Sequence, residues 1–551
     1  MNKNLNIFSS SFLIPNNSSW QVIAKNFKLN FKFLSQLQEE KNIKQKEKIL
    51  VSIFFSADVL EEFHSSFTLK KIKNIADSLL SLFENKAKNN KSPVIILGSF
   101  VQKKNLLDNP SGKTNNEIFF NYFCDQVKIL QNKFSNIYFV NLDNSFNNFK
   151  YDEIFDNRNW YLANCRLSTF GIEKVAESLS LVINKIYNPP KKLLILDCDN
   201  TLWGGIIGED GVEKISLGQD GLGKAYLDFQ RVVKKLNKDG LLLAICSKNN
   251  YNDVIKAFNH KSMQIKKRDI VSFKVNWEEK SKNIKDIARD LNIGLDSIVF
   301  WDDNPLERDK VRLNLPEVLT IEPNSEIVEW PSQLKSLDIF SKFKITEEDK
   351  NKTKQYKSRE KFELNLKKFD DQNKYLKKIK LKAKKISISK STINRAVQMI
   401  NKTNQMNLRS LRYNQKEVEN LNNKKNIVFL VNLKDIYGDH GIIGLLIANY
   451  IAKNKIFLDT FLVSCRVFGR NIETWMMDQL KRSAVKMGYK DIYAEYIPSK
   501  KNQVASRILE SHNFKKVRNN KIKKNIKLRL KGKLFYCKAK NIDTKKAKVY
   551  G

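Results

Sequence analysis

The chain has 551 residues and a formal net charge of +40, with 41% hydrophobic and 11% aromatic residues. This length exceeds one compact core and predicts about two to four domains. The sequence has neither the ~20 consecutive apolar residues that span a bilayer nor, at its start, the features of a secretory signal. We therefore expect a cytoplasmic protein without a membrane span.

The positive charge is spread along the chain and becomes dense only in the run KKVRNNKIKKNIKLRLKGK (515–533). This run lacks interleaved aromatic residues, and a solvated lysine-rich surface accounts for it. We therefore expect no nucleic-acid partner.

Residues 1–188 alternate apolar strand patterns with helical patterns, which predicts an α/β domain. The strand patterns are KILVSIFFSA (48–57), SPVIILGSF (92–100) and NIYFVNL (136–142). A closing helix, GIEKVAESLSLVINKIY (171–187), is followed by NPP (188–190). Proline stops a helix, so we place the end of this domain at residue 188.

Residues 191–325 contain three short apolar runs that each end in polar residues. The runs are KLLILD (192–197), LLLAICSKN (241–249) and SIVFWDDNP (297–305). Helical patterns separate them, which predicts a second α/β domain with a buried parallel sheet. Ligands of such sheets bind beyond the carboxyl ends of the strands.

A highly charged stretch, residues 326–375, is predicted to be a helical linker. Residues 376–540 then combine helices with strands that meander before a long helix, which predicts an α+β domain. Within that helix a four-residue spacing predicts one buried face, formed by Ile472, Met476, Leu480 and Ala484.

Charged and hydroxyl side chains gather at the ends of the three apolar runs of the second domain. Together with the lysine that begins the helix before the last run, they are Asp197, Asp199, Ser247, Lys248, Asp302, Asp303 and Lys280. Neighbouring carboxylates repel each other unless a cation lies between them, so this set predicts a Mg²⁺ site. The hydroxyl and ammonium groups suit phosphoryl oxygens. With Asp197 as nucleophile and Asp199 as acid/base, the set predicts phosphoryl transfer from a small phosphorylated substrate.

The order D-x-D-N-T, a strand-ending Ser, a Lys and a D-D pair resembles the four motifs of the haloacid-dehalogenase-like (HAD) phosphotransferase superfamily. The resemblance implies that Asp197 accepts the phosphoryl group and that Asp199 is the acid/base and also binds metal through its carbonyl. It implies further roles for four residues: phosphoryl binding by Ser247 and Lys280, and Mg²⁺ ligation by Asp302 and, in second place, Asp303. The alternative to a role in this site is, for Lys248, an ordinary exposed position on the surface.

Longer stretches are similar to FkbH-like proteins of polyketide and surface-glycan pathways. They are DCDNTLWGGIIGEDG (197–211), the segment from VNWEEKS to NPLER (275–308) and SCRVFGRNIE (464–473). The resemblance implies that Trp203-Gly204-Gly205 forms a turn and flap over the site, where glycine permits φ > 0. It also implies 1,3-bisphosphoglycerate as a type of substrate and an acyl carrier protein as partner.

The stretch RVFGRN (466–471) resembles the pyrophosphate loop, R-x-x-G-x-G, of GNAT acyltransferases. The resemblance implies that Arg466, Gly469, Arg470 and Asn471 bind CoA or a phosphopantetheine arm, because a helix N-terminus favours anions. Asn471 replaces the last glycine of the family's pattern. The alternative is therefore a domain that keeps the GNAT-like fold but binds neither CoA nor a phosphopantetheine arm.

The six cysteines lie far apart without a C-x-x-C pair, and the chain has four histidines, so we expect neither a zinc site nor disulfides. FkbH-like members that load glyceryl groups need a thiol, for which Cys198 and Cys465 are the candidates. The negative charges of the two aspartates beside Cys198 disfavour its thiolate form. The alternative is that the Cys198 side chain points into the hydrophobic core. Cys465 adjoins Arg466 and a helix start and is electrostatically better placed.

The block ANCRLSTFGIEKVAESL (163–179) resembles the end of SGNH-hydrolase-like domains. Where that family has its catalytic Asp and His, this chain has Ala163 and Arg166. No G-D-S motif stands near Ser52 or Ser56. The resemblance therefore implies a non-catalytic scaffold or docking domain.

Together these patterns predict three domains: a degenerate SGNH-like α/β domain (1–188), a HAD-like Rossmannoid α/β domain (191–325) and, after the linker, a GNAT-like α+β domain (376–540). The main hypothesis is a Mg²⁺-dependent phosphoryl or glyceryl transferase that loads an acyl carrier protein. One alternative is a phosphatase fused to an N-acetyltransferase-like domain. The other is a non-catalytic assembly module, which would be expected to have lost the catalytic residues that are intact here.

Overall fold

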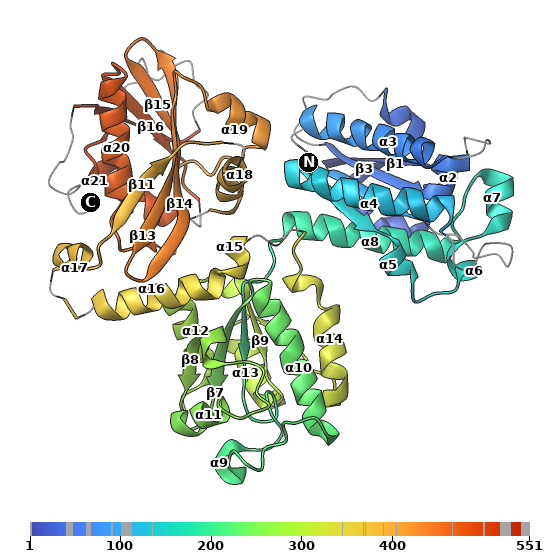
Figure 1. Ribbon diagram of the computed structural model, residues 1–551, viewed down its shortest axis with the longest axis horizontal. Coiled ribbons are helices and arrows are strands. Elements are labelled where there is room, and N and C mark those ends of the chain that lie inside the picture. The colour runs from blue at the N-terminus through green and yellow to red at the C-terminus, as the bar shows by residue number, and fades with distance from the viewer. Residues whose placement is uncertain are drawn as a thin grey trace. The chain divides into compact units, whose positions relative to one another are not determined.

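The structure is a computed structural model (Figure 1), and its contacts divide the chain into two units. The described residues are 3–39, 48–61, 68–89, 92–100, 113–134, 136–343, 345, 347–366, 368–369, 371–389, 391–403, 405–464, 467–499, 502–517 and 531–540. The first unit comprises Met1–Asn188, Ser389–Asn401 and Leu411–Asn423, and the second comprises Pro189–Ile388, Lys402–Ser410 and Lys424–Gly551. Among the described helices, none combines the length and apolar character that crossing a membrane requires. The domain boundaries expected from the sequence stay a prediction.

The first sheet has five parallel strands in the spatial order β2-β1-β3-β4-β5. They are β1 (Lys3–Ser9), β2 (Phe27–Phe33), β3 (Lys48–Phe55), β4 (Val94–Ser99) and β5 (Ile137–Asn141). The three strands expected from apolar runs are confirmed, whereas β1 and β2 lie where the sequence predicts no strand. Strand β1 contains Asn4 and Asn6, a residue type depleted in strands, which weakens its sequence signal.

Helices cover both faces of the first sheet. Helices α3 (Leu69–Asn89) and α4 (Asn115–Lys133) lie side by side on the face that carries Phe54. Helix α8 (Thr169–Tyr187) packs on the opposite face, and it ends before the prolines as predicted. Shorter helices are α1 (Gln21–Ala24), α2 (Ser56–Glu61), α5 (Asp143–Phe146), α6 (Tyr151–Ile154) and α7 (Asn157–Ala163).

The second sheet also has five parallel strands, in the order β10-β9-β6-β7-β8. They are β6 (Leu193–Leu196), β7 (Leu242–Ser247), β8 (Ile270–Val275), β9 (Ile298–Trp301) and β10 (Leu319–Thr320). After β6 the chain adds β7 and β8 on one side of β6, and it then adds β9 and β10 on the other side. The strand order therefore reverses between β6 and β9, which is where ligands bind in sheets of this kind.

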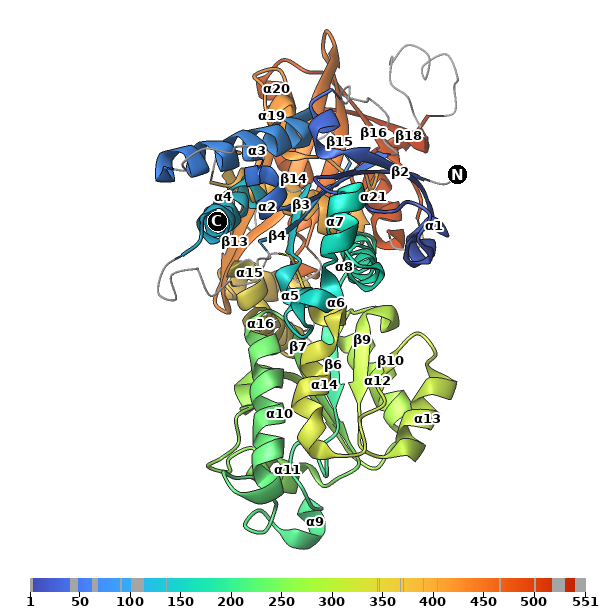
Figure 2. The same ribbon diagram turned by 90° about the vertical axis from the view of Figure 1, so that its right-hand side faces the viewer.

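The second sheet is buried on both faces. Helices α10 (Gly221–Lys238), α11 (Tyr251–Ala257) and α14 (Trp330–Ser336) pack on one face, and α10 and α14 lie side by side (Figure 2). Helices α12 (Lys280–Leu291) and α13 (Pro305–Asn314) pack on the other. Trp330 and Leu334 are buried beside α10, so this core extends past residue 325.

The third sheet is antiparallel apart from one parallel pair, β15 and β16. Its order is β11-β13-β14-β15-β16-β18-β17, with β12 paired to β15. The strands are β11 (Lys382–Ile386), β12 (Met406–Asn407), β13 (Ile427–Asp435), β14 (Gly438–Ala452), β15 (Lys455–Val463), β16 (Asp491–Tyr496), β17 (Lys515–Lys516) and β18 (Lys533–Lys538). The meander β13-β14-β15 before a helix agrees with the sequence prediction.

Helix α20 (Ile472–Lys486) follows β15 after a short loop. The four side chains predicted to form its buried face are all fully buried: Ile472, Met476, Leu480 and Ala484. The regular spacing therefore reports core packing.

The charged stretch before the third sheet is helical, as expected. Its helices are α15 (Glu347–Lys350), α16 (Lys352–Leu366) and α17 (Gln372–Lys378). Tyr356 of α16 belongs to the core of the second sheet, and Phe362 of the same helix belongs to the core of the third. The remaining helices named below or shown in Figure 1 are α9 (Ile207–Asp210), α18 (Ile393–Lys402), α19 (Gln415–Leu421) and α21 (Ile508–Ser511).

Candidate functional site

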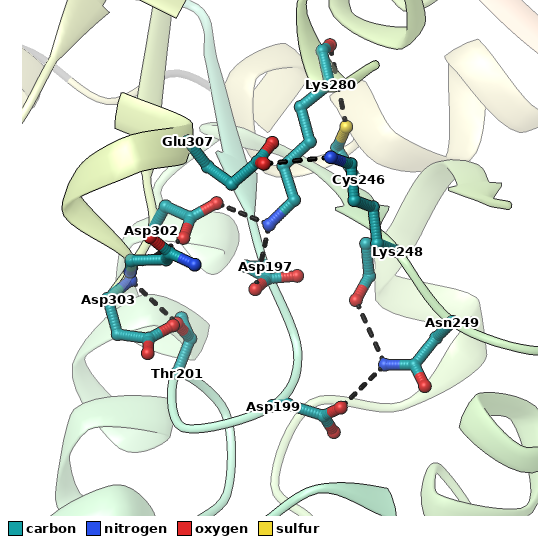
Figure 3. A network of polar contacts seen from close by, with 12 residues as sticks. Asp197, Asp199, Thr201, Cys246, Lys248, Asn249, Lys280, Asp302, Asp303 and Glu307 are labelled. Atoms are coloured by element: carbon teal, nitrogen blue, oxygen red, sulfur yellow. Dashed lines mark hydrogen bonds and ion pairs between the residues drawn. The ribbon is translucent and has the colours of Figure 1, made fainter. Parts of the chain in front are cut away.

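The carboxyl edge of the second sheet gathers the residues that the sequence singles out (Figure 3). Asp197 follows β6, Ser247 ends β7, Asp302 follows β9 and Lys280 begins α12. Parallel strands present their carboxyl ends at one edge, so residues up to 105 positions apart in the chain meet there.

A buried lysine joins the two central carboxylates. Lys280 Nζ lies 2.9 Å from Asp197 Oδ2 and 2.6 Å from Asp302 Oδ2. All three side chains are nearly excluded from solvent. Burial by itself lowers the pKa of Lys280, but the carboxylates of Asp197 and Asp302 outweigh that effect and raise the pKa above its ordinary value. The ammonium group therefore stays charged and compensates part of the negative charge.

Three carboxylates form a cluster that fits a divalent cation. Each of Asp197, Asp302 and Asp303 offers an oxygen atom, and these atoms lie within 4.8 Å of one another. Asp197 Oδ1 is buried and accepts no hydrogen bond from any described residue. Burial first, and then the Asp197 carboxylate, raises the pKa of Asp302 to about 7 against the opposing effect of Lys280. Hard oxygen donors and uncompensated negative charge suit Mg²⁺.

Asp303 is oriented by the segment that follows β6. Thr201 Oγ1 donates to Asp303 Oδ1 at 3.1 Å, and the Asp303 backbone N–H donates back to Thr201 Oγ1 at 3.3 Å. Burial and the Asp197 carboxylate raise the pKa of Asp303. The third member of the carboxylate cluster is thus fixed in place by a residue of the D-C-D-N-T motif.

Asp199 lies apart from the carboxylate cluster and is held by nitrogen donors. Trp203 Nε1 and the Ile207 backbone N–H donate to Asp199 Oδ1 at 2.9 and 3.1 Å. Asn249 Nδ2 donates to Asp199 Oδ2 at 2.8 Å. Asn249 has no role in the sequence prediction, although it stands two residues after Ser247.

The segment after Asp199 makes the tight turn that the glycines suggest. Gly205 has φ +98°, and an added Cβ there would lie 2.5 Å from Asp210 Oδ2. The Gly205 N–H donates to Asn200 Oδ1, and the Ile206 N–H donates to Asp210 Oδ2. The positive φ requires a residue such as glycine, so the expected turn is confirmed.

Lys248 points to an acidic neighbour. Its Nζ lies 2.8 Å from Glu307 Oε1, and the Glu307 side chain is mostly buried. Although burial raises the pKa of Glu307, Lys248 outweighs that effect and lowers it. Lys248 therefore has an ion-pair partner within the protein itself.

Of the two candidate thiols, Cys198 lies in the hydrophobic core beneath the site and is fully buried. Burial and the two flanking aspartates raise its pKa well above the ordinary value. A buried thiol with a raised pKa is a poor nucleophile, which favours the core position over the thiol role. Cys465 lies outside the described residues, as does Arg466.

The described part of the predicted anion loop of the third sheet turns inward. Gly469 and Asn471 both have positive φ. The Arg470 side chain is fully buried, donates from Nε to Asp435 Oδ2 at 2.9 Å and stacks 3.9 Å from the centre of the Phe362 ring. Arg470 therefore has a structural role, and the sequence prediction missed Asp435 because it lies 35 positions upstream on β13.

We expect the substitution Asp435→Asn to destabilise the protein by about 3–5 kcal/mol, because it leaves the buried Arg470 charge without its counter-charge. Urea unfolding followed by circular dichroism measures the effect. The control is Asp125→Asn, which removes the counter-charge of Lys128 in an exposed ion pair and is expected to cost at most about 1 kcal/mol. Equal losses in the two variants would contradict the assigned role of the Asp435–Arg470 pair.

The first sheet has its own polar cluster at its carboxyl edge. Ser10 Oγ donates to Asp58 Oδ2 at 2.7 Å, and Arg166 pairs with the same carboxylate. Ser52 is buried within β3, and Ser56 Oγ donates to the Phe100 carbonyl oxygen. The Arg166 backbone N–H also donates to Ser11 Oγ at 2.9 Å. The hydroxyls near Arg166 are thus those of Ser10 and Ser11, which directly follow β1, a strand that the sequence pattern does not reveal.

No protein-family model and no curated protein matches the sequence. Among solved structures, the chain is similar to the N-terminal part of the protein BF1531 from Bacteroides fragilis, which contains a phosphatase domain and is complexed with Mg. The two are 26% identical with a TM-score of 0.53, and the match covers 62% of this chain and 95% of that one.

Weaker matches involve a GNAT-family acetyltransferase from Staphylococcus aureus and the ribosomal-protein-S18-alanine N-acetyltransferase from Escherichia coli. They are 14% and 10% identical, with TM-scores of 0.24 and 0.22. They cover 29% and 28% of this chain, and 99% and 94% of the other chains. Matches of this strength carry no functional inference. Over nearly the whole length of the Bacteroides fragilis structure, however, this chain is similar to a protein with a phosphatase domain.

Proposed function

We propose that the second sheet carries a Mg²⁺-dependent phosphatase or phosphotransferase site with Asp197 as nucleophile. The observation that carries the proposal is the cluster of Asp197, Asp302 and the half-buried Asp303, with Lys280 paired to both Asp197 and Asp302. The similarity to the BF1531 phosphatase-domain structure supports it.

In this reaction an Asp197 oxygen forms a bond to phosphorus while the bond from phosphorus to the leaving oxygen breaks. Asp199 gives a proton to the leaving oxygen and then takes one from the water that cleaves the aspartyl-phosphate, which restores Asp197 and releases phosphate. Ser247 and Lys280 hold phosphoryl oxygens. Asp197, Asp302 and Asp303 would hold a Mg²⁺ ion, which would supply positive charge to neutralise the phosphoryl group.

The proposal extends to a small phosphorylated metabolite such as 1,3-bisphosphoglycerate as substrate and an acyl carrier protein as acceptor. Its support is the sequence similarity of residues 197–211 and 464–473 to FkbH-like proteins. CoA or a phosphopantetheine arm would bind near the loop that ends at Asn471, and Cys465 is the better thiol candidate.

A second candidate function is hydrolysis of a phosphorylated substrate without transfer of an acyl group. The burial of Cys198 and Arg470 favours it, because two residues that a transfer mechanism would use are withdrawn from solvent. Incubation with 1,3-bisphosphoglycerate and Mg²⁺, followed by phosphate determination and intact-mass analysis, separates the candidates. Phosphate release with a glyceryl adduct supports transfer, and release without an adduct supports hydrolysis. Absence of release would exclude 1,3-bisphosphoglycerate as the substrate of either function.

We expect Mg²⁺ to raise the melting temperature of the wild-type protein, because the ion binds only the folded carboxylate cluster. A concentration of 100 times the dissociation constant stabilises the protein by about 2.7 kcal/mol. Differential scanning fluorimetry with and without Mg²⁺ measures the shift. It should be retained in Asp228→Asn, which alters an exposed carboxylate of α10, and lost in Asp302→Asn. A shift of the same size in both variants would contradict the proposed ligand set.

A further inference from the structure

The amide of Asn249 connects two residues of the proposed phosphoryl-transfer site (Figure 3). Its Nδ2 lies 2.8 Å from Asp199 Oδ2 and 3.3 Å from Ser247 Oγ. The side chain is buried. An amide NH₂ has two hydrogens, and this geometry directs one to each partner. In the opposite amide orientation an oxygen would face Asp199 Oδ2, and the ionised form of Asp199 has no hydrogen to give it.

The other hydrogen bonds of Asp199 identify which of its oxygens can exchange a proton. A carboxylate oxygen has two lone pairs. Those of Oδ1 are taken by Trp203 Nε1 and the Ile207 backbone N–H. Oδ2 accepts only the Asn249 amide among the described residues and keeps one lone pair. The proton that Asp199 transfers therefore travels on Oδ2, the oxygen that Asn249 holds.

The same amide leaves the Ser247 hydroxyl ready to donate. Because Ser247 Oγ accepts a hydrogen from Asn249, its own O–H remains to donate, either to the Cys198 thiol beside it, a weak acceptor, or to a stronger acceptor in a bound substrate. A phosphoryl oxygen, which carries no hydrogen as a dianion, is an acceptor of the right kind. One buried amide thus orients a carboxyl group that follows β6 and a hydroxyl group at the end of the neighbouring strand β7.

We propose that Asn249 is a positioning residue that orients Asp199 Oδ2 for proton transfer to the leaving group and directs the Ser247 hydroxyl toward the phosphoryl group. This inference rests on the proposed phosphatase or phosphotransferase function. Asn249 acts through Asp199 and Ser247 and forms no bond to phosphorus. Proton transfer by a positioned acid is worth roughly 10²–10⁴-fold in rate, so its misdirection is measurable.

The test compares two aryl phosphates of similar shape that differ in their need for an acid. The 4-nitrophenolate ion leaves without a proton, whereas phenolate leaves far better when protonated. In Asn249→Ala we expect kcat/KM for phenyl phosphate, which reports formation of the phosphoenzyme, to fall about 10- to 100-fold. For 4-nitrophenyl phosphate kcat/KM should fall less than about threefold, which is the loss expected from misdirection of the Ser247 hydroxyl alone. Loss of general packing would lower both rates equally.

Two further variants complete the experiment. Asn249→Asp keeps the size of the side chain but turns the donor into a carboxylate, so phenyl phosphate hydrolysis should again fall more than 4-nitrophenyl phosphate hydrolysis. The matched control is Asn250→Ala, because Asn250 is exposed and its side chain makes no capping hydrogen bond to α11. It should leave both rates unchanged.

Equal losses for the two substrates in Asn249→Ala, or unchanged rates in Asn249→Asp, would overturn the role of Asn249 and leave the proposed function standing. A wild-type protein that hydrolyses neither substrate with Mg²⁺ would overturn the proposed function itself, and the inference with it.

Discussion

Replacing Asp197 with asparagine is expected to lower Mg²⁺-dependent phosphate release by at least about 10⁴-fold, as loss of a catalytic nucleophile does in other enzymes. The amide keeps the size of the side chain, but its oxygen does not displace a leaving group from phosphorus. Lys280 retains its contact with Asp302 at 2.6 Å, so the fold should persist. Phosphate release from 4-nitrophenyl phosphate measures the loss.

The control for this prediction is Asp228→Asn, which makes the same chemical change at an exposed site of α10. It should keep wild-type activity. Far-UV circular dichroism should show both variants folded. If Asp197→Asn turned over substrate within tenfold of the wild-type rate, another group would have to be the nucleophile.

The substitution Lys280→Met is expected to cost about 3–5 kcal/mol of stability in the absence of metal, because it leaves the buried carboxylates of Asp197 and Asp302 without their shared counter-charge. Urea unfolding measures the loss. Lys282→Met, on the same helix but exposed and paired with Glu278, should change stability by less than about 0.5 kcal/mol. Activity should be lost as well, since Lys280 holds phosphoryl oxygens in the proposed reaction.

The loss in Lys280→Met should depend on pH with a defined sign. The pKa of Asp302 is already raised to about 7 in the folded protein, above its ordinary value, and removal of Lys280 raises it further. The folded state then binds a proton that the unfolded state releases, so stability rises as pH falls through this range. The deficit should therefore be larger at pH 8 than at pH 6. The double variant Lys280→Met/Asp302→Asn should recover part of it, and a deficit independent of pH would contradict the charge argument.

The second sheet and its polar edge are readable from the sequence because both depend on local pattern. Continuous apolar runs such as those of β6, β7 and β9 indicate strands buried on two faces, and polar residues directly after each run lie at the carboxyl edge. Because these strands are parallel, the meeting of Asp197, Asp302, Asp303 and Lys280 at one edge could be predicted without knowledge of distant contacts.

Other features depend on partners far away in the chain and were not predictable. Arg470 looked like an anion-binding residue because its neighbours resemble a known loop, but Asp435 holds it inside the protein. Strand β1 was missed because asparagines interrupt its apolar pattern. Asn249 carried no signal, because its importance arises only when β6 and β7 lie side by side and bring Asp199 next to it.

The most direct measurement for the central claim is the site of covalent phosphorylation. The wild-type protein would be quenched in acid while it turns over 4-nitrophenyl phosphate with Mg²⁺, and its peptides analysed by mass spectrometry. The proposed mechanism predicts a phosphoryl group on Asp197 that is absent without Mg²⁺ and absent in Asp197→Asn. Phosphate release without modification of Asp197, or a phosphoryl group on a different residue, would contradict it.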